Sequence, residues 1–350
     1  MSNAFDTAGR YLTAWLRLLP AETAHDIGML AMERGLLHFL PRSPVHQFKI
    51  PLQVDLPGIG LARHPIGLAA GFDKNARCPG AFEHMGLSFL ELGTVTPRPQ
   101  PGNPKPRLFR YPETRALINR MGFNSDGAEA VLDRLRKLSW SDGRVPIGIN
   151  VGKNKQTPPD LALNDFLTGI QTFEPHARWL TVNISSPNTP GLRELATPDF
   201  LRDLSQMLGG VRSKCWIKLD PDMSKREFQQ MISTIKSEGY QGVIISNTHR
   251  VEWPEAGGQS GHPLLSPSNT CLEWAWDVTK GSLPVIASGG VLSGVDAFHK
   301  LARGASAVQI YTALVYRGPG AAYSICEELA AELTLRGFTS AAEAIGSLYT

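Results

Sequence analysis

The sequence predicts an α/β fold, a (β/α)8 TIM barrel preceded by an N-terminal two-helix hairpin. From Pro65 onward, short apolar segments alternate with helical ones, and eight strand–helix units in about 270 residues suit such a barrel. Several predicted strands are almost continuously apolar, such as Val243–Ile245, as expected when helices cover both faces of a sheet. No predicted strand is followed by Gly-x-Gly-x-x-Gly, so a doubly wound dinucleotide-binding sheet is the weaker alternative.

Two helical segments precede the barrel. Residues 5–19 carry apolar side chains at helical spacing, and Pro20 ends that segment. A second helix is predicted from about residue 22 to about residue 40, and its apolar surface is too wide for one stripe against a core. This width favours a docking hairpin for a membrane surface or an apolar ligand, while a helical cap on the barrel is the alternative.

The boundary between hairpin and barrel is predicted at Pro44, because Pro41-Arg-Ser-Pro44 interrupts helical structure. The predicted domains are therefore the hairpin, residues 1–44, and the barrel, residues 45–350. Residues 45–64 are interpreted as a linker with a short β-hairpin around Leu56-Pro-Gly58. The barrel strands are predicted at 65–72, 88–95, 145–151, 179–185, 215–219, 242–247, 283–288 and 307–312. The helices between them are predicted at 78–86, 124–137, 160–173, 198–209, 224–237, 268–279, 293–302 and 319–335.

The composition argues against several classes of protein. The chain is 42% hydrophobic and 19% charged, which is enough apolar material for a full core. A formal charge of +3 is too small to indicate nucleic-acid binding. The four cysteines are scattered, which suits reduced thiols in the cytosol and predicts neither a metal site nor an iron–sulfur cluster. No apolar run is long enough to span a bilayer, and the N-terminus lacks a secretion-signal pattern.

Polar side chains and glycines recur where the predicted strands end, the place where such barrels carry their chemistry. The fourth strand breaks into the polar stretch Thr181–Gly191, whose amides and hydroxyls would cost free energy if buried without partners. A turn built from Ser, Asn, Pro and Gly is the alternative for that stretch alone. Because the other strands end similarly, we expect a binding site here; their ends are Ala69–Asn75, Gly93–Pro99, Gly148–Asn154, Ile217–Pro221, Ser246–Thr248, Ser288–Gly290 and Gln309–Thr312.

The ends of the seventh and eighth strands predict a phosphate site. Ser288-Gly-Gly290 and Tyr311-Thr312 lie where barrels commonly bind phosphate through backbone N–H groups. The glycine-rich segment Gly257–Gly261 offers a further contact. One phosphate site without a dinucleotide motif favours a mononucleotide cofactor such as FMN, although Gly-Gly turns also occur as plain helix starts.

Lys218 is predicted to point from an apolar strand into the mouth of the barrel. A buried ammonium is costly unless it is paired, so a negative partner is expected. The anion of a reduced flavin ring would serve, and the lysine would then favour reduction. An ion pair with Asp73 or Asp220 is the alternative.

A third group at the strand ends is rich in amides, which suit a flat heterocycle with imide groups, while a lysine suits a carboxylate. No His, Glu or Cys at the strand ends offers a proton acceptor. Ser186 is therefore the best-placed acceptor, although a serine hydroxyl is a weak base and needs help. The members of the group are Asn119, Asn183, Asn188, Asn247 and Lys74.

At these residues the sequence closely resembles the dihydroorotate dehydrogenases of the quinone-dependent, membrane-associated class (class 2). The matching stretches run nearly end to end: Pro20–His25, Ala69–Lys74, Gly93–Asn103, Asn119–Asn124, Asn183–Leu192, Ser260–Gly261 and Val308–Thr312. The resemblance implies oxidation of (S)-dihydroorotate to orotate in de novo pyrimidine (UMP) synthesis. FMN would accept the hydride, and ubiquinone would be the final electron acceptor.

The resemblance also implies residue roles. Ser186, where the soluble class is expected to carry Cys, would take the C5 proton while C6 delivers hydride to the flavin. The substrate would contact Lys74, Asn119, Arg120, Met121, Gly122, Phe123, Asn183, Asn188, Asn247 and Thr248. FMN would contact Ala70, Gly71, Phe72, Asp73, Lys74, Thr94, Asn150, Asn183, Lys218, Ser246, Gly261, Gly290, Tyr311 and Thr312. His25 and Arg110 would line the quinone entrance. The chain departs from the family at Ser246, where Thr is expected, and at Asn75-Ala-Arg77.

The implied partners are dihydroorotate, ubiquinone and a membrane, with no nucleic acid and no metal. The N-terminal helices would bind a monomer peripherally to the cytoplasmic face of a bacterial inner membrane. One alternative is an FMN barrel of another class, such as a flavin-dependent RNA-modifying reductase, which needs a basic groove and a proton-donating cysteine. The other is a non-catalytic barrel whose hairpin serves as a membrane-bound scaffold.

Overall fold

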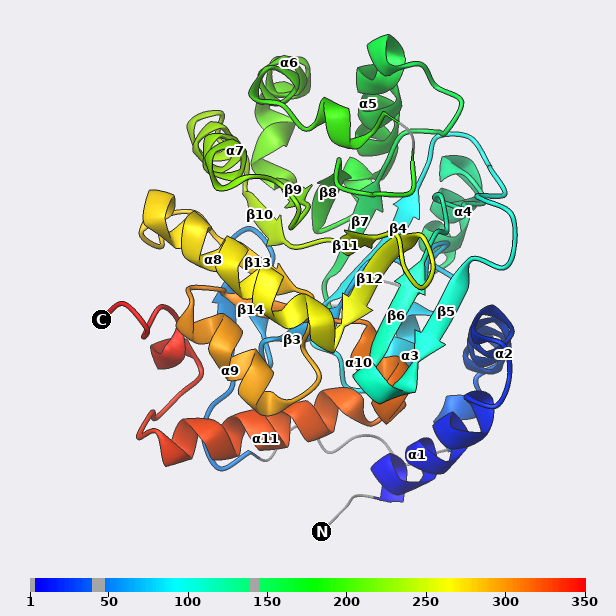
Figure 1. Cartoon of the computed structure of the whole chain (residues 1–350), viewed down its shortest axis with the longest axis vertical. Coiled ribbons are helices and arrows are strands. Elements are labelled where there is room, and N and C mark those ends of the chain that lie inside the picture. The colour runs from blue at the N-terminus through cyan, green and yellow to red at the C-terminus, as the bar shows by residue number, and fades with distance from the viewer. Residues whose placement is uncertain (1–3, 40–47, 139–144, 190) are drawn as a thin grey trace.

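The computed structural model describes residues 4–39, 48–138, 145–189 and 191–350. Their centre is a closed barrel of eight parallel strands, each paired with its neighbours in chain order and the last paired with the first (Figure 1). The barrel strands are β3 (Ile66–Leu68), β4 (Leu90–Val95), β7 (Ile147–Val151), β8 (Trp179–Asn183), β9 (Cys215–Leu219), β10 (Gly242–Ile245), β13 (Val285–Ser288) and β14 (Ala307–Ile310). The predicted barrel is thus confirmed, with strands that are mostly shorter than predicted.

The helices surround the barrel in the alternating order that the sequence predicts. They are α3 (Pro79–His84), α4 (Ala128–Lys137), α5 (Ala162–Phe173), α6 (Pro198–Leu208), α7 (Lys225–Ser237), α8 (Leu265–Thr279), α9 (Gly294–Ala302) and α11 (Ala321–Leu335). Local signals fix several of their starts. For α7, the Ser224 Oγ accepts from the Glu227 N–H while the Glu227 carboxylate accepts from the Ser224 N–H, a capping box. A short helix that we did not predict, α10 (Thr312–Arg317), follows β14 directly.

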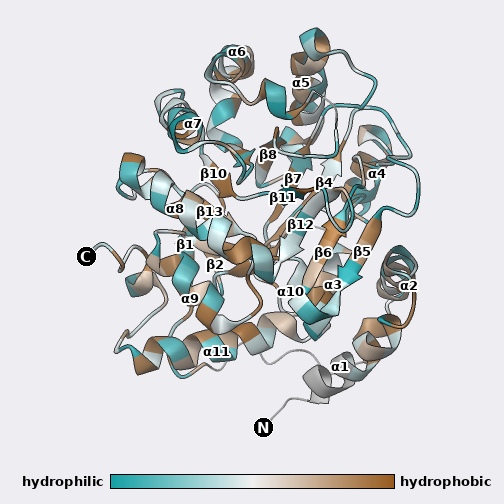
Figure 2. Ribbon diagram, viewed as in Figure 1, coloured by the Kyte–Doolittle hydropathy of each residue, from teal (hydrophilic) through white to brown (hydrophobic). Residues whose placement is uncertain are grey.

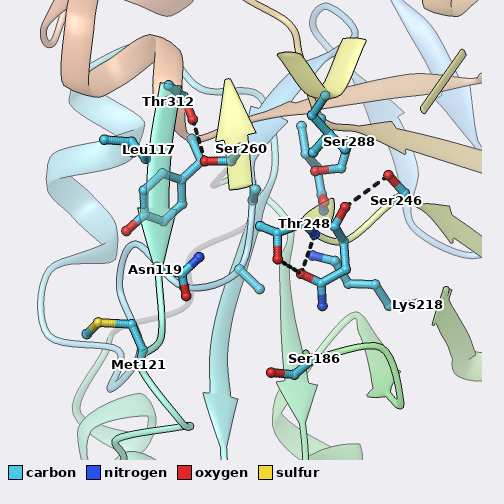
Figure 3. Close-up of a pocket in the computed structure, with 18 of the residues that line it drawn as sticks. Leu117, Asn119, Met121, Ser186, Lys218, Ser246, Thr248, Ser260, Ser288 and Thr312 are labelled. Carbon is cyan, nitrogen blue, oxygen red and sulfur yellow. Dashed lines mark hydrogen bonds between the residues drawn. The ribbon is translucent and has the colours of Figure 1, made fainter. Parts of the chain in front are cut away.

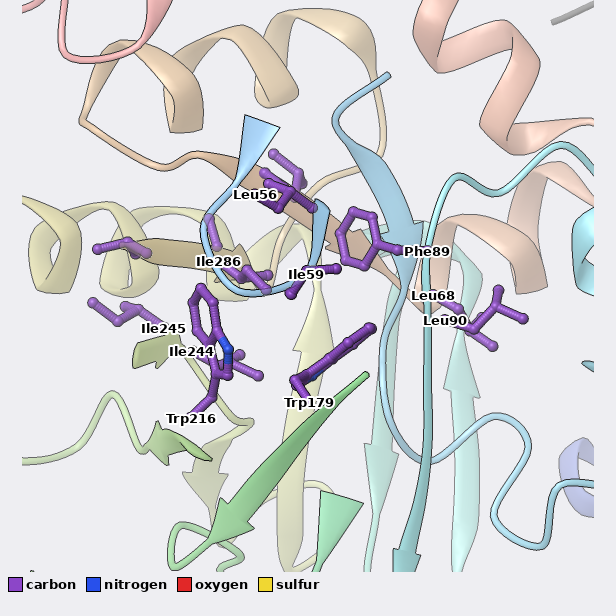
Figure 4. Close-up of a cluster of buried hydrophobic side chains, with 14 of the residues drawn as sticks. Leu56, Ile59, Leu68, Phe89, Leu90, Trp179, Trp216, Ile244, Ile245 and Ile286 are labelled. Atoms are coloured by element: carbon purple, nitrogen blue, oxygen red, sulfur yellow. The ribbon is translucent and has the colours of Figure 1, made fainter. Parts of the chain in front are cut away.

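The floor of the barrel is an aromatic cluster that requires glycines in the strands. A Cβ on Gly148 would lie 1.9 Å from the ring of Trp179, so only glycine leaves room for that indole. Leu56 and Ile59 lie against this cluster (Figure 4) and belong to the predicted hairpin, now β1 (Val54–Leu56) and β2 (Gly60–Ala62). The arrangement repeats in two further pairs, Gly67 with Phe89 and Gly242 with Trp216. The floor is therefore closed, and ligands enter at the opposite end.

A second sheet, which the sequence did not predict, covers part of the carboxyl end of the barrel. Its strands come from the loops after β4 and β10 and pair antiparallel in the order β11-β12-β6-β5. Their bounds are β5 (Leu108–Tyr111), β6 (Ala116–Asn119), β11 (His249–Val251) and β12 (Gly257–Gly261). The segment that we interpreted as a glycine-rich phosphate loop is thus a strand, in which Gly258 pairs with Asn119.

The N-terminal helices lie at the margin of the barrel, where α1 (Ala4–Leu16) packs against α10 and α2 (Ala21–Glu33) packs against β5 (Figure 1). The second helix ends earlier than predicted, at Glu33, because Gly35 adopts a φ of 73° before a short 3-10 helix, η1 (Leu36–Phe39). The predicted boundary at Pro41–Pro44 lies outside the described residues. Within the described residues, no helix combines the length and apolar character needed to span a bilayer.

Candidate active site

A cavity opens at the carboxyl ends of the barrel strands, beneath the β5–β6–β12 sheet (Figure 3). Two lysines and no carboxylate, histidine or cysteine line it among the described residues. It is lined by Ala69, Ala70, Gly71, Lys74, Thr94, Leu108, Leu117, Asn119, Met121, Gly122, Phe123, Asn183, Ser186, Pro187, Asn188, Lys218, Ser246, Asn247, Thr248, Ser260, Gly261, Leu264, Ser288, Gly289, Gly290, Val291, Gln309, Ile310, Tyr311 and Thr312. Unbalanced positive charge in a recessed site favours anionic ligands.

Ser186 lies at one end of the cavity, just beyond β8 (Figure 3). Its Oγ accepts a hydrogen bond from the Asn188 N–H at 3.3 Å. The Asn188 amide in turn donates to Asn119 Oδ1 at 3.2 Å, and the Asn119 amide donates to the Gly258 carbonyl at 3.1 Å. The serine is therefore surrounded by amides whose orientation is fixed by the sheet above. Apart from the two lysines, no ionisable base in the described part of the chain lines the cavity beside it.

Lys218 is buried at the end of β9, and its ammonium has no hydrogen bond or ion pair in the part of the chain that the structure describes. The alternative partners are engaged elsewhere. Asp73 accepts from the N–H groups of Arg77 and Cys78 at 2.9 and 3.0 Å, and Asp220 pairs with Arg193 at 3.4 Å. An unpaired buried ammonium facing a cavity indicates that an anionic or electron-rich ligand completes the site.

A chain of buried amides connects the barrel interior to the cavity, and it starts at Glu91. One oxygen of this fully buried carboxylate accepts from Asn150 Nδ2 at 2.6 Å, and the other accepts from Gln309. Asn150 must then direct its Oδ1 outward, where it accepts from Thr94 Oγ1 at 2.6 Å and from Asn183 Nδ2 at 3.1 Å. Because a carboxylate only accepts hydrogen bonds, Glu91 sets the orientation of the amides behind the cavity wall.

The other end of the cavity is made of backbone. Gly289 and Gly290 have φ values of 100° and 83°, and a Cβ on Gly290 would lie 2.3 Å from the Cα of Leu265. Their N–H groups donate to no protein acceptor within the described ranges. Ser260 and Thr312, hydroxyl to hydroxyl at 3.0 Å, lie beside this turn (Figure 3). Free backbone donors and hydroxyls together suit a phosphate.

Lys74 is the second cation of the cavity. Burial, with the nearby positive charge of Arg107, lowers the pKa of Lys74 to about 8. The lysine is therefore charged at neutral pH and loses its proton more readily than a surface lysine does. It provides a point charge for a ligand carboxylate.

A second cavity lies between the helices α1 and α2 and the barrel, and it is almost entirely apolar. Side chains of both helices line it, among them Leu12, Leu16 and Met32, and so do His25 and Arg110. Burial, together with the charge of Lys74, lowers the pKa of His25 to about 3, so its imidazole is neutral. Leu108, Leu117 and Tyr311 line both cavities and form the wall between them.

Comparison with known proteins identifies the family. Residues 51–333 match the family model described as dihydroorotate dehydrogenase. The chain belongs to the dihydroorotate dehydrogenase family. It is 40% identical over 349 residues to the dihydroorotate dehydrogenase (quinone) of Myxococcus xanthus, covering 94% of each chain. It is 42% identical to that of Cereibacter sphaeroides, covering 96% of each.

Solved structures agree with this assignment. The structure of the ligand-free DHODH of Eimeria tenella superposes with a TM-score of 0.87 at 37% identity, covering 94% of this chain and 99% of the other. The ferulenol complex of the Eimeria tenella protein gives a TM-score of 0.86 at 36% identity. The chain is therefore a member of the quinone-dependent class of dihydroorotate dehydrogenases, as its motifs indicated.

Most residues predicted to contact substrate or FMN line the polar cavity, and four of them do not. Asn150 lies behind the wall in the amide chain. Asp73 is buried under its own loop, and Phe72 faces the apolar cavity, where its ring lies 5.1 Å from that of His25. Arg120 turns away to Glu255, at 2.8 Å, and lies over the ring of Phe109.

Sequence reasoning missed other residues of this dihydroorotate dehydrogenase site. Glu91 was detectable, since a carboxylate in the middle of the apolar run Phe89–Leu92 requires a partner. Nothing in the sequence marked Leu108 and Leu117 as cavity residues, because their position depends on strand pairing in the second sheet. Arg110, predicted at the quinone entrance, lines the apolar cavity and donates to the carbonyls of Leu16 and Leu19 at the end of α1.

Proposed function

We propose that this chain oxidises (S)-dihydroorotate to orotate in pyrimidine biosynthesis, with FMN as hydride acceptor and ubiquinone as final electron acceptor. The observation that carries the proposal is a single cavity that combines Ser186, an unpaired Lys218 and a glycine turn with free N–H groups. An RNA-modifying reductase is less well supported, because it needs a proton-donating cysteine, whereas all four cysteines here are buried and none lines the cavity.

The residues present fit FMN. The phosphate would lie at the Gly289–Gly290 turn, with Gly261 and Thr312 beside it, and the ring system would lie against Thr94 and Lys218. When bound, FMN supplies the ring that accepts the hydride. Lys218, on β9, would then direct its positive charge at the flavin ring and so favour negative charge on the ring. Ser246 keeps a hydroxyl on the cavity wall where the family is expected to have Thr.

The substrate would occupy the amide-rich end of the cavity. Asn119, Asn188 and Asn247 present amide donors and acceptors for the imide groups, and Lys74 presents its ammonium to the carboxylate. As an alkoxide, Ser186 Oγ would accept the C5 proton and return to the neutral hydroxyl. The Asn188 N–H donates to that oxygen at 3.3 Å, so it would stabilise the alkoxide before the transfer. The surrounding side chains exclude water from this step, since Asn183 and Ser186 are both buried.

The apolar cavity would admit the quinone. Its wall of Leu108, Leu117 and Tyr311 is shared with the polar cavity, so an acceptor there would lie next to the flavin site. Exposed apolar side chains on α1 and just after it, including Tyr11, Trp15 and Leu18, are 71%, 73% and 77% accessible. Hydrophobic residues also occur in β5, in β6 and at the adjacent end of α1 (Figure 2). Such a surface suits an interfacial helix.

We further propose that residues 1–44 form a docking unit and that residues 45–350 form the FMN barrel. The unit would bind a monomer to the cytoplasmic face of a bacterial inner membrane. Deleting residues 1–40 should then spare flavin reduction by substrate and slow reoxidation by quinone at least tenfold, because only the second step uses that surface. Equal loss of both steps would instead make the hairpin structural.

An anaerobic titration tests the reaction itself. The purified protein should be yellow, dihydroorotate should bleach its flavin absorbance, and a ubiquinone analogue should restore it. A flavin-loaded protein that dihydroorotate fails to bleach would overturn the proposal. A yellow protein inert to both reagents would favour the membrane scaffold instead.

A further inference from the structure

One arginine outside the cavity connects the ends of three barrel strands. Arg193 lies just after the Ser186 loop, and its side chain is 19% accessible. Its Nε donates to the Ser185 carbonyl at 3.2 Å and lies 3.4 Å from Asp220 Oδ2. Its Nη1 donates to Asp222 Oδ2 at 2.7 Å, and its Nη2 donates to the Thr248 carbonyl at 3.1 Å. All three nitrogens of the guanidinium therefore donate hydrogen bonds.

These contacts tie together segments that each carry part of the proposed site. Ser185 follows β8 and precedes Ser186. Asp220 follows β9, two residues beyond Lys218. Thr248 follows β10 and, like Ser186, lines the cavity (Figure 3). Since each loop leaves a different strand, no backbone hydrogen bond of the barrel itself fixes the spacing between Ser186 and Thr248. Two side chains bridge the loops instead. Asn247 Nδ2 donates to Ser185 Oγ at 2.9 Å, and the Arg193 guanidinium binds the Ser185 and Thr248 carbonyls.

The bond to Ser185 bears directly on the serine. The Ser185 carbonyl belongs to the peptide group that ends at the Ser186 nitrogen, so fixing this oxygen fixes the plane of that peptide. Asn183 Oδ1 accepts from the N–H and the hydroxyl of Ser185 at 3.3 and 3.0 Å. Ser186 therefore follows a residue, Ser185, that is fixed by Asn183 through its N–H and hydroxyl and by Arg193 through its carbonyl.

The carboxylates that orient Arg193 are themselves fixed. Asp222 Oδ2 also accepts from the Arg250 N–H at 2.8 Å, its Oδ1 contacts His249, and the Asp222 N–H donates to Asp220 Oδ1 at 2.8 Å. Burial raises the pKa of Asp220, and Arg193 counteracts that shift. The guanidinium is thus pre-positioned by two acids and directed at two carbonyls.

We propose that Arg193 is a positioning residue for the first half-reaction, setting the spacing between the Ser186 hydroxyl and the Asn247–Thr248 edge of the substrate pocket. The inference rests on the proposed function, in which Ser186 takes the substrate proton. Neither the glycine turn nor the apolar cavity contacts Arg193, so cofactor retention and quinone reduction do not depend on it.

The informative substitution is Arg193→Lys, because it keeps the charge opposite both acids and removes the planar fork that reaches both carbonyls. A matched control is Arg303→Lys. The Arg303 side chain is 20% accessible and binds the Glu273 carboxylate at 2.9 Å and the His299 carbonyl at 3.1 Å, in the outer helix layer. Both variants are made in the full-length protein.

Both half-reactions are followed anaerobically by stopped-flow flavin absorbance. Arg193→Lys should reduce the rate of flavin reduction by saturating dihydroorotate about 100-fold, since a displacement of about 1 Å has that effect. Flavin content and the rate of reoxidation by a ubiquinone analogue should change by less than about twofold. The melting temperature should change by less than about 4 °C. Arg303→Lys should leave both rates unchanged. Added guanidinium should partly rescue reduction in Arg193→Ala and have no effect on Arg303→Ala.

Three outcomes overturn the inference while the wild-type flavin is still reduced by dihydroorotate. One is wild-type reduction in Arg193→Lys. Another is equal loss of both half-reactions with loss of flavin, which would make Arg193 a general structural residue. The third is failure of guanidinium to rescue a folded, flavin-loaded Arg193→Ala. Failure of the wild-type flavin to be reduced would instead refute the proposed function.

Discussion

The two cavities that meet at Leu108, Leu117 and Tyr311 are built in different ways. The polar cavity is made from strand ends, and buried hydrogen-bond chains such as Glu91–Asn150–Asn183 fix its groups. The apolar cavity is closed by two helices that a few side chains hold to the barrel. Proton and hydride transfer need groups fixed to fractions of an ångström, whereas binding an apolar acceptor needs only a hydrophobic cavity of suitable width.

The tethers of the helices show the contrast most clearly. Arg107 binds Glu22 at 2.8 Å, Arg110 binds carbonyls at the end of α1, and Arg77 pairs with Glu33. Within the departure from the family at Asn75–Arg77, Arg77 thus contacts α2, and none of the three residues lines the polar cavity. Changes in the polar cavity should therefore affect the first half-reaction strongly, and changes at the tethers should affect the second half-reaction weakly.

The largest expected effect is that of Ser186→Ala. Removing the hydroxyl should slow flavin reduction by dihydroorotate by about 10²- to 10⁴-fold, because among the residues that the structure describes no other proton acceptor lines that end of the cavity. Reoxidation by a ubiquinone analogue should not change. Stopped-flow absorbance measures both rates, and Ser213→Ala, an exposed serine at the opposite end of the barrel, is the control. Full reduction rate in Ser186→Ala would remove the serine from the mechanism.

A smaller effect is expected for Lys218→Met. Loss of a charged hydrogen-bond donor to the cofactor should raise the FMN dissociation constant by about 10- to 100-fold. Recovery of flavin fluorescence on dilution measures it. Lys225→Met, at a lysine 54% accessible on α7, should leave FMN affinity as it is. Unchanged affinity and flavin potential in Lys218→Met would show that the lysine faces something other than the flavin.

The two cavities should also differ in pH dependence. Because burial lowers the pKa of Lys74 to about 8, its positive charge is lost as pH rises through that value. The kcat/KM for dihydroorotate should then fall above pH 8 by up to about tenfold per pH unit. His25, with its pKa near 3, stays neutral, so kcat/KM for quinone should show no break from it between about pH 5 and about pH 9. Persistence of the alkaline break in Lys74→Met would assign it elsewhere.

The smallest effect is expected at the tether, in Glu22→Gln. The apparent KM for quinone should rise about two- to fivefold without a change in flavin reduction, since a partly buried ion pair contributes modestly. Burial alone would raise the pKa of Glu22, but Arg107 and Lys105 outweigh it and hold that pKa below its usual 4.5. The contribution of the tether is therefore complete above pH 4.5 and is lost as pH falls through the lowered value. Lys105→Gln, at a lysine 61% accessible, should change less; a larger change there would contradict this ranking.

The same contrast explains what the sequence could predict. The barrel strands were readable because each is an apolar run followed by polar residues, and the polar cavity followed from knowing that strand ends converge. The β12–β6 pairing was not readable, because it joins residues such as Ala116 and Gly261 across most of the barrel. The apolar cavity depends on that sheet and on how α2 ends, so only its helices and the lining residues His25 and Arg110 were foreseen. The direction of Arg120 was not readable for the same reason, since it is set by Glu255.

The most direct test of two separate cavities is to ask whether product and quinone exclude each other. Flavin reduced in advance with dithionite is mixed anaerobically with a ubiquinone analogue, with and without saturating orotate. If the cavities are distinct, orotate in the polar cavity leaves the reoxidation rate within about twofold of its value without orotate. Competitive inhibition by orotate, overcome by raising quinone, would show that both reactants share one site and would contradict this account.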